Sequence, residues 1–194
     1  MGARGRLIAG GLGLFLVLAG GTAFVTGIVR LPITCEGPSP AWDSPFGAAG
    51  TQVADLKEAA PYLAFTPVIP RGLGSPAKFF IGGNTPDMSA RGLIWVYEQP
   101  VYGRFWVKES IAEVVQTQNW IESMRNNPTG CSNESVVTIR GGTTAALSVG
   151  NPAASGSGSS TTSIMWLDHG LLIVALGPKG SFTKDHAIEV ANQV

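Results

Sequence analysis

The residues of this chain that could carry chemistry are few and widely spaced. It has two histidines, His169 and His186, and its carboxylates show no paired spacing that would mark a general acid and base. The serine-containing run Gly156-Ser157-Gly158-Ser159 lies in a low-complexity spacer and is not a Gly-x-Ser-x-Gly nucleophile elbow. Neither a Walker loop nor a Gly-x-Gly-x-x-Gly turn occurs. We therefore expect no catalytic residues, no cofactor and no enzymatic activity.

The two histidines have ordinary structural explanations. Asp168-His169-Gly170 separates the apolar runs SIMWL and LLIVAL, and this pattern predicts a β-hairpin with Gly170 at a position that needs positive φ. His186 falls in the first turns of the predicted last helix, where it is exposed or lightly packed. A hydrolase with an unrecognised site stays an alternative, and it would need a pocket that joins one histidine to a nucleophile.

The chain has two cysteines, Cys35 and Cys131. An even count in an exported domain favours a disulfide, and closing so long a loop stabilises by up to about 4 to 5 kcal/mol in the chain-entropy model. Lipidation of Cys35 is a weaker alternative, because Pro32-Ile33-Thr34 lacks the small residue expected before a lipidated cysteine. A zinc site is weaker still, since no ligand pair has finger spacing. We expect no bound metal.

Tryptophans are the residues most open to a binding interpretation. Trp95, Trp106, Trp120 and Trp166 could line a groove on a curved sheet that binds a lipid or a peptide. The alternative is that they fill the core between the sheet and its helices, which is the commoner use of such residues.

An uncharged stretch, Leu7–Val29, is long enough to cross a bilayer, which takes about 20 apolar residues. Arg4 and Arg6 precede it and only Arg30 follows, so the positive-inside rule places the N-terminus in the cytoplasm and the rest of the chain outside. The sequence therefore predicts a single-pass protein of the cytoplasmic membrane.

A cleaved signal peptide is the competing interpretation of this stretch, with Leu12–Leu18 as its apolar region and Ala19-Gly20-Gly21 as the cleavage site. The anchor is favoured because the apolar run continues past that site, and both interpretations export the domain. Within the anchor, Ala19, Ala23 and Gly27 have the four-residue spacing of a helix-pairing face. The alternative is the ordinary richness of membrane spans in glycine and alanine, which is the commoner cause of such spacing.

Composition limits the remaining possibilities. The formal net charge is zero and charged residues make up 13% of the chain, so no basic surface favours nucleic acid. The chain has 26 glycines and 13 prolines, which is typical of a loop-rich protein with many turns. We expect a membrane anchor over residues 1–30, a linker rich in proline and glycine over 31–50 and one domain over 51–194.

The pattern of the domain predicts an α+β fold, in which a curved antiparallel sheet packs against a central and a C-terminal helix. A helix over Thr51–Ala60 and an edge strand over Leu63–Val68 come first. The predicted elements that follow are a three-stranded meander over Ala77–Ile81, Gly92–Gln99 and Tyr102–Lys108, a capped helix over Ser110–Arg125, one strand in Ser135–Val149, the hairpin in Ser163–Gly177 and a closing helix with Ala187, Ile188, Ala191 and Val194 on one face.

The order of these elements resembles a bacterial extracytoplasmic domain family of unknown function. The landmarks are Pro67, Pro70-Arg71-Gly72, Gly141-Gly142 and Trp166, and the similarity covers about Ala54 to Val194. That family is similar to the outer-membrane lipoprotein carrier and the sigma-E regulatory protein. The resemblance implies a curved sheet with a helix packed across it, and a role in binding or sensing. Only about six residues precede Leu7, so we expect this chain to depart from the pattern by lacking a cytoplasmic anti-sigma domain, and we expect no direct sigma-binding role.

Three functions stay open at this level. The favoured one is a non-catalytic binding or sensor module, held outside the membrane, which contacts a protein partner or a lipid or peptide ligand. The second is an accessory or structural subunit of a larger membrane complex. The third is the hydrolase.

Overall fold

The computed structural model describes residues 34–35, 50–82, 92–112, 131–151, 155–156 and 160–194. The chain divides into two units, and all of these residues lie in the second, Ile33–Val194. The predicted anchor Leu7–Val29 and its face of Ala19, Ala23 and Gly27 lie outside the described residues. Within those residues, no helix combines the length and the apolar character that crossing a membrane requires.

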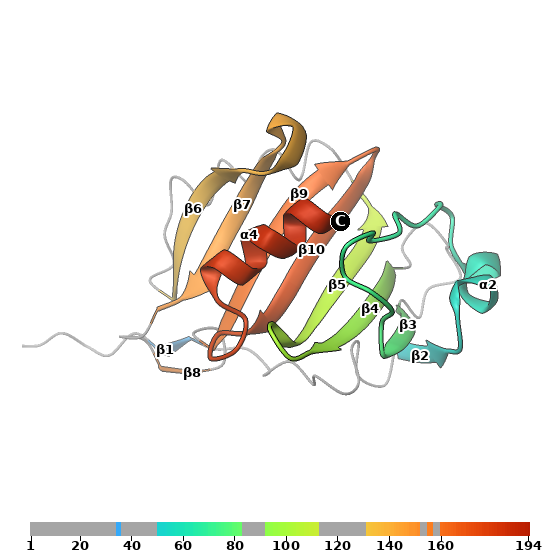
Figure 1. Cartoon of the computed structure of the whole chain (residues 1–194), viewed down its shortest axis with the longest axis horizontal. Helices are drawn as coiled ribbons and strands as arrows, with labels where there is room; N and C mark the ends of the chain where they lie inside the picture. The colour runs from blue at the N-terminus through green and yellow to red at the C-terminus, as the bar shows by residue number, and fades with distance from the viewer. Residues whose placement is uncertain (1–33, 36–49, 83–91, 113–130, 152–154, 157–159) are drawn as a thin grey trace, which may run out of the picture. The chain divides into compact units, whose positions relative to one another are not determined.

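An eight-stranded antiparallel sheet forms the domain, with the order β2-β3-β4-β5-β10-β9-β7-β6 (Figure 1). Its strands are β2 (Gly50–Val53), β3 (Lys78–Gly82), β4 (Gly92–Gln99), β5 (Gly103–Ile111), β6 (Ser132–Thr138), β7 (Thr144–Gly150), β9 (Thr161–Asp168) and β10 (Leu171–Pro178). A separate parallel pair joins β1 (Thr34–Cys35) to β8 (Ser155–Gly156).

The α+β class, the meander and the hairpin are confirmed. Strands β3, β4 and β5 pair in sequence order, and β9 pairs with β10 around the predicted turn. The meander and the hairpin are joined by β5 and β10, which pair from Leu171 opposite Ile111 to Leu176 opposite Trp106. This one long-range pairing makes a continuous sheet from two locally formed pieces.

The predicted start of the central helix is wrong. Ser110 and Ile111 are the last residues of β5 and pair with Leu172 and Leu171 of β10. The capping pattern at Ser110 is a local signal, and pairing with a strand far along the chain overrides it. The remainder of that prediction, residues 113–125, lies outside the described residues.

Three other predictions need correction. The segment Ser135–Val149 holds two strands, because Gly141 and Gly142, at φ of 64° and 79°, allow a tight turn within the short helix η4 (Arg140–Gly142). Residues Leu63–Val68 form no strand, since Pro67 and Pro70 flank Val68 and cannot donate to a ladder. The first helix is only α2 (Leu56–Ala59), capped by Asp55 and continued by η2 (Ala60–Tyr62), because residues 50–53 pair with β3.

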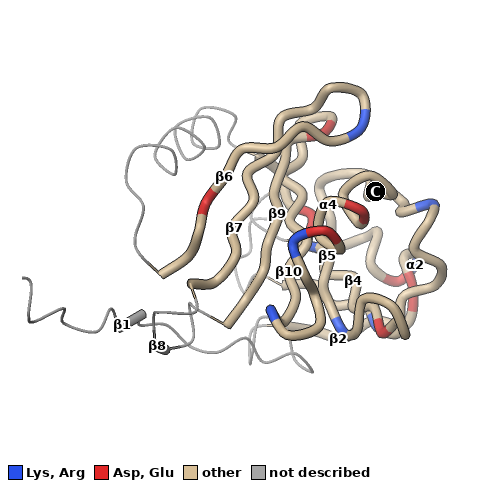
Figure 2. The backbone as a smooth tube through the Cα atoms, turned by 60° about the vertical axis from the view of Figure 1, so that its left-hand side comes forward, with Lys and Arg blue, Asp and Glu red and all other residues tan. Residues whose placement is uncertain are grey.

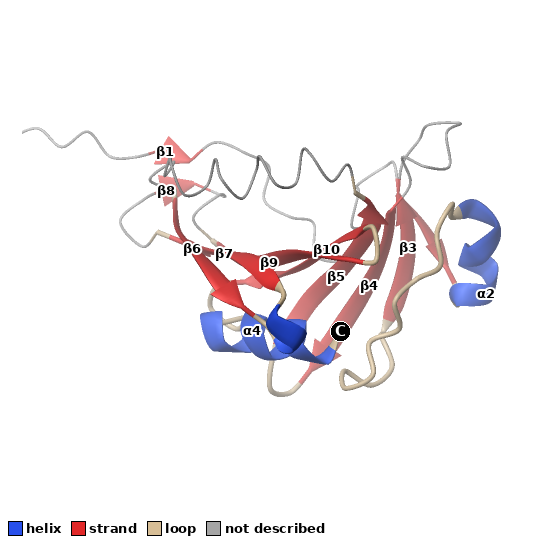
Figure 3. Ribbon diagram, turned by 90° about the horizontal axis from the view of Figure 1, so that it is seen from above, coloured by secondary structure: helices blue, strands red, loops and turns tan. Residues whose placement is uncertain are grey.

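The C-terminal helix α4 (Lys184–Gln193) is confirmed. Thr183 caps it by accepting the His186 backbone N–H, and Ala187, Val190 and Ala191 are buried against the sheet. Figure 3 shows α4 on one face of the curved sheet, and Figure 2 shows charged residues at turns and on α4 as well as on strands such as β6. The α4 face of the sheet is therefore the main core.

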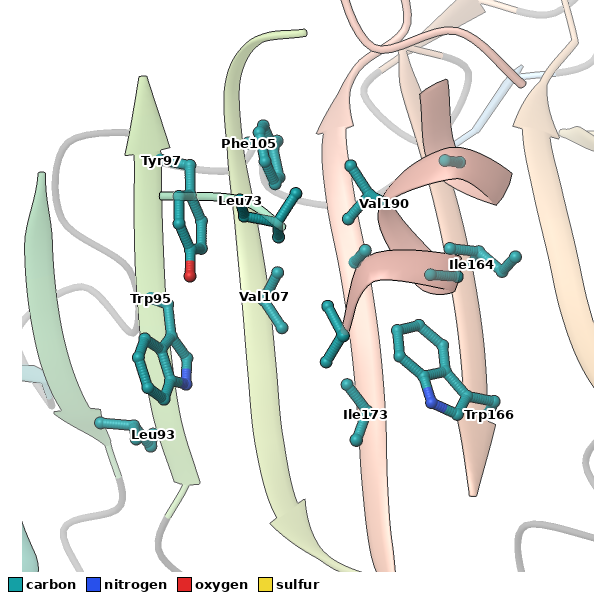
Figure 4. Packing of buried hydrophobic residues seen from close by; sticks show 14 of the residues in the cluster. Leu73, Leu93, Trp95, Tyr97, Phe105, Val107, Ile164, Trp166, Ile173 and Val190 are labelled. Carbon is teal, nitrogen blue, oxygen red and sulfur yellow. The ribbon is translucent and has the colours of Figure 1, made fainter. Parts of the chain in front are cut away.

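A second, irregular cover lies beside α4 on the same face. This segment, Leu63–Leu73, is called the strap below, and it crosses in front of β4 and β5 (Figure 1). The strap packs Leu63, Phe65, Val68 and Leu73 against the core. The buried core beneath both covers includes Leu93, Trp95, Tyr97, Phe105, Val107, Leu147, Ile164, Trp166, Ile173 and Phe182, many of which appear in Figure 4.

Gly177 and Gly180 offer a matched test of how α4 docks. A Cβ at Gly177 would meet Phe182 Cβ at 2.4 Å, whereas a Cβ at Gly180 would meet nothing within 4 Å. We expect Gly177→Ala to lower the free energy of unfolding by about 1 to 3 kcal/mol, because Phe182 is fully buried and cannot move without disturbing the core. Gly180→Ala should change it by less than about 0.5 kcal/mol. Urea unfolding measures both, and equal effects would contradict this packing.

Candidate functional site

A pocket of about 330 Å³ lies at one end of the sheet, where the β9–β10 turn meets the β6–β7 turn. We call it the hairpin-end pocket. Its lining combines an aromatic and an aliphatic side chain with a guanidinium, a carboxylate and an imidazole. The lining residues are Ile139, Arg140, Gly141, Thr143, Trp166, Asp168 and His169.

Two tight turns hold the polar side chains at this pocket. His169 and Gly170 have φ of 48° and 82°, which gives the two-residue turn that matches the twist of the β9–β10 hairpin. A positive φ is unusual for a residue with a side chain, so His169 accepts some backbone strain there. On the other side, Asn192 of α4 accepts the Arg140 backbone N–H at 2.7 Å. One rim is thus held by a tight turn, and the other is held by a hydrogen bond from η4 to α4.

Asp168 is the electrostatic centre of the rim. Its Oδ2 lies 3.3 Å from Arg140 Nη2, and its Oδ1 lies 2.5 Å from His169 Nδ1. The Asp168 side chain is 23% exposed and that of His169 is 88% exposed. Ion pairs with this much solvent contact contribute little to stability, about 0 to 1 kcal/mol. These groups are therefore free to exchange their partners for those of a ligand at small cost.

Trp166 separates the pocket from the core. It is 1% exposed, and its indole N–H has no hydrogen-bond partner. Figure 4 shows the ring nitrogen on the side that faces Ile173 of β10. The strand register places Trp166, Ile173 and Glu109 in one row across β9, β10 and β5. The row therefore leads from the pocket wall to a buried carboxyl group.

Glu109 is the most unusual residue of the described structure. It is fully buried on the α4 face, among apolar and aromatic side chains, and the next row toward the hairpin end contains Asp168. One oxygen, Oε2, accepts the Val68 backbone N–H of the strap at 3.0 Å, while Oε1 has no partner. An ionised carboxylate with a single hydrogen bond is costly to bury.

Burial is the main reason that the pKa of Glu109 rises from its ordinary 4.5 to about 7. The negative charge of Asp168 raises it further, whereas the hydrogen bond from Val68 and the nearby Trp95 indole N–H lower it. The Trp95 N–H still lacks a partner of good geometry. With a pKa of about 7, the neutral acid and the carboxylate are both populated near neutral pH.

Tyr97 shares this environment. Its hydroxyl is buried without a partner, and burial raises its pKa, with the charge of Glu109 acting in the same direction. Trp95, Tyr97, Glu109 and Trp166 together form what we call the buried polar cluster. Its members lie on one face of three strands, and each carries a buried polar atom without a partner. Such atoms are rare in native proteins and call for a physical explanation.

The predicted tryptophan set is divided by the structure. Trp95 and Trp166 lie in the core beneath the strap and α4, whereas Trp106 points to the opposite face and packs with Phe80, Ile94 and Val96. Trp120 lies outside the described residues. The tryptophans therefore do not line one common groove.

The histidines are also separated. His169 lies in the β9–β10 turn, while His186 lies beyond the far end of β10 and makes an edge contact with Tyr102, 5.3 Å between ring centroids. A strand of eight residues spans roughly 25 Å, so the two imidazoles belong to different ends of the sheet. Among the described residues, no group of three His, Cys, Asp or Glu side chains is arranged to hold a metal ion.

Cys131 is disulfide-bonded. The side chain of Cys35 lies outside the described residues, and Cys35 is the only other cysteine in the sequence. Cys131 precedes β6, and its carbonyl oxygen accepts the Asn151 backbone N–H at 2.8 Å. The predicted pairing of Cys35 with Cys131 stays a prediction.

Sequence reasoning missed Glu109, although a signal was present. In the run Phe105-Trp106-Val107-Lys108-Glu109, strict alternation puts Glu109 on the same face as Phe105 and Val107. Ending this strand at Lys108 to begin a helix at Ser110 hid that signal. Arg140 was missed because its approach to Asp168 depends on two turns that are distant in sequence.

The chain matches no protein-family model, no curated protein and no solved structure. The resemblance to lipoprotein-carrier-like domains stays a prediction.

The buried carboxyl predicts a stability that depends on pH. Because the pKa of Glu109 is higher in the folded than in the unfolded chain, its contribution is complete below about pH 4.5 and is lost as the pH rises through 7. The loss is at most about 3 kcal/mol. Glu109→Gln should flatten the profile of unfolding free energy between pH 5 and 8, as measured with urea.

Glu98→Gln is the matched control for that profile. Glu98 lies on β4, half exposed, and pairs with Arg104 at 2.5 Å. This variant should keep the pH dependence of the wild type. An equally steep profile in Glu109→Gln would contradict the assignment.

Proposed function

We propose that this chain is a single-pass membrane protein whose domain acts as a non-catalytic binding or sensor module outside the cytoplasmic membrane. The uncharged stretch Leu7–Val29, with Arg4 and Arg6 before it, supports the anchor and its orientation. The separation of His169 from His186 supports a binding role over the hydrolase alternative.

The hairpin-end pocket is the observation that carries the binding role. It joins an apolar floor, made by Trp166 and Ile139, to polar groups that face outward from two rigid turns. A few convergent polar groups around an apolar pocket are characteristic of ligand sites. The weak surface pairs of Asp168 leave its carboxylate and the Arg140 guanidinium available to a ligand.

A peptide or protein side chain suits this pocket better than a lipid. The α4 face, where a carrier-like domain would hold acyl chains, is filled by α4 and the strap, with Trp95 and Trp166 fully buried. The hairpin-end pocket is open at the sheet end and has room for one or two side chains. The proposed ligand is therefore a segment of a partner protein that inserts a flat or aliphatic group against Trp166.

Membrane topology is tested with a cysteine at Val101, which is 66% exposed in the β4–β5 turn. In intact cells, Val101→Cys should react with a membrane-impermeant maleimide, while Arg4→Cys should react only after permeabilisation. The wild type should stay unlabelled, because both native cysteines are expected to be paired. Labelling of Val101→Cys only after permeabilisation would contradict the proposed location.

Binding is tested by panning a random-peptide library against the full chain in detergent micelles. Enriched peptides should lose at least tenfold in affinity for Thr143→Trp, which fills the hairpin-end pocket. Thr138→Trp is the control, because Thr138 is exposed on β6 outside the pocket lining. Peptides that bind both variants equally, or a library without enrichment, would count against this site.

A further inference from the structure

Within the part of the chain that the structure describes, few polar contacts attach the strap to the domain. Val68 N–H donates to Glu109 Oε2 at 3.0 Å, Arg71 N–H donates to Gln193 O at 3.1 Å, and Gln99 Nε2 donates to Leu73 O. The strap has no ladder hydrogen bonds, because it is neither helix nor strand. Segments held in this way open at lower free energy than the sheet beneath them.

Of these three contacts, only the one to Glu109 involves a group that can gain or lose a proton in the neutral range. The Val68 N–H is satisfied by the neutral acid or by the carboxylate, but the neutral acid avoids burying a charge. The second oxygen, Oε1, and the indole N–H of Trp95 have no partner while the strap is closed. Water that entered after opening would satisfy both.

We propose that the strap is a pH-responsive cover: Glu109 holds it closed when protonated and releases it when ionised, which admits water to the buried polar cluster. The event is a gain or loss of one proton at the Glu109 carboxyl, and the proton is exchanged with the solvent. The proposal goes beyond the binding function and does not depend on it. If the domain lies outside the membrane, the strap responds to external pH.

The charges around Glu109 set the direction of the response. Asp168 at the end of β9 disfavours the carboxylate, and Tyr97 on β4 is neutral in the same pH range. The strap itself has no titratable group from Leu63 to Pro70, and Arg71 is exposed. The titratable residues of α4, which are Lys184, Asp185, His186 and Glu189, belong to its first six residues, whereas Gln193 at its end meets the strap.

The same carboxylate links the cover to the hairpin-end pocket. Asp168 lines that pocket and also acts on Glu109 through its charge. A ligand cation placed beside Asp168 would weaken this repulsion and favour the carboxylate, and linkage requires ionised Glu109 to favour the cation in return.

Hydrogen exchange of the full chain in detergent micelles tests the cover directly. Amide protection factors, which are corrected for the intrinsic effect of pH on exchange, are compared at pH 5.5 and 8.5. Strap amides should lose roughly 30-fold in protection at the higher pH, as expected for a carboxyl that ionises near 7 when closed and near 4.5 when open. Amides of β10 serve as the internal reference and should change far less.

Two variants make the outcome decisive. Glu109→Gln should show the same strap protection at both pH values, and Glu98→Gln should behave as the wild type. Asp168→Asn, which removes a partly exposed charge, should keep the transition but move its midpoint to lower pH. The proposal would be overturned if strap protection in the wild type did not change with pH, or if the transition persisted in Glu109→Gln. It would also be overturned if the midpoint in Asp168→Asn stayed where it is in the wild type. The Asp168→Asn test can be made even if Glu109→Gln fails to fold.

Discussion

Burial of one face of the sheet is the constraint on which this structure depends. Apart from Glu109, the rows from Leu93 and Trp95 on β4 to Ile164 and Trp166 on β9 are apolar and must be kept from water. A single ten-residue helix, α4, covers β9 and β10, and the strap covers the part above β4 and β5. Among the described residues, regular structure therefore covers one part of the core and an irregular segment covers another.

This division explains why the unusual polar groups gather where they do. A helix satisfies its own backbone groups, but an irregular segment must find partners on the surface that it covers. The strap finds one in Glu109, at the cost of a carboxyl group in an apolar core. The unpartnered atoms of Trp95, Tyr97 and Trp166 lie on the same face, and the Asp168 rim of the hairpin-end pocket lies one row beyond them. The proposed binding pocket and the proposed strap opening thus involve neighbouring parts of one face.

The elements specified by local signals could be predicted from the sequence. The β9–β10 hairpin follows from Asp168-His169-Gly170 between two apolar runs, and α4 follows from the spacing of Ala187, Ala191 and Val194. Predictions failed where distant pairing decides. Ser110 has the signature of a helix cap, yet it is drawn into β5 by Leu172 of β10. The strap has the alternating apolar residues of an edge strand. These residues pack against the core, but the strap forms no ladder hydrogen bonds with a neighbouring strand.

The candidate site shows the same limit. The tryptophans could be recognised as core or groove residues, but strand parity alone places Trp106 on the other face from Trp95 and Trp166. Glu109 could be recognised as a buried residue only if β5 was predicted to continue beyond Lys108. The contact between Arg140 and Asp168 could not be predicted, because it depends on how two separate turns approach each other. The sequence shows which residue types are present, but it does not show which of them lie close together in the fold.

The account depends most directly on the state of one carboxyl group. A ¹³C NMR titration of the Glu109 side-chain carboxyl in the full chain, assigned by its loss in Glu109→Gln, measures that state without reference to stability. The account predicts a midpoint near pH 7, since burial raises the pKa of Glu109 to about 7. A midpoint near 4.5, the ordinary value, would show that water reaches Glu109 in the folded domain and would contradict the account.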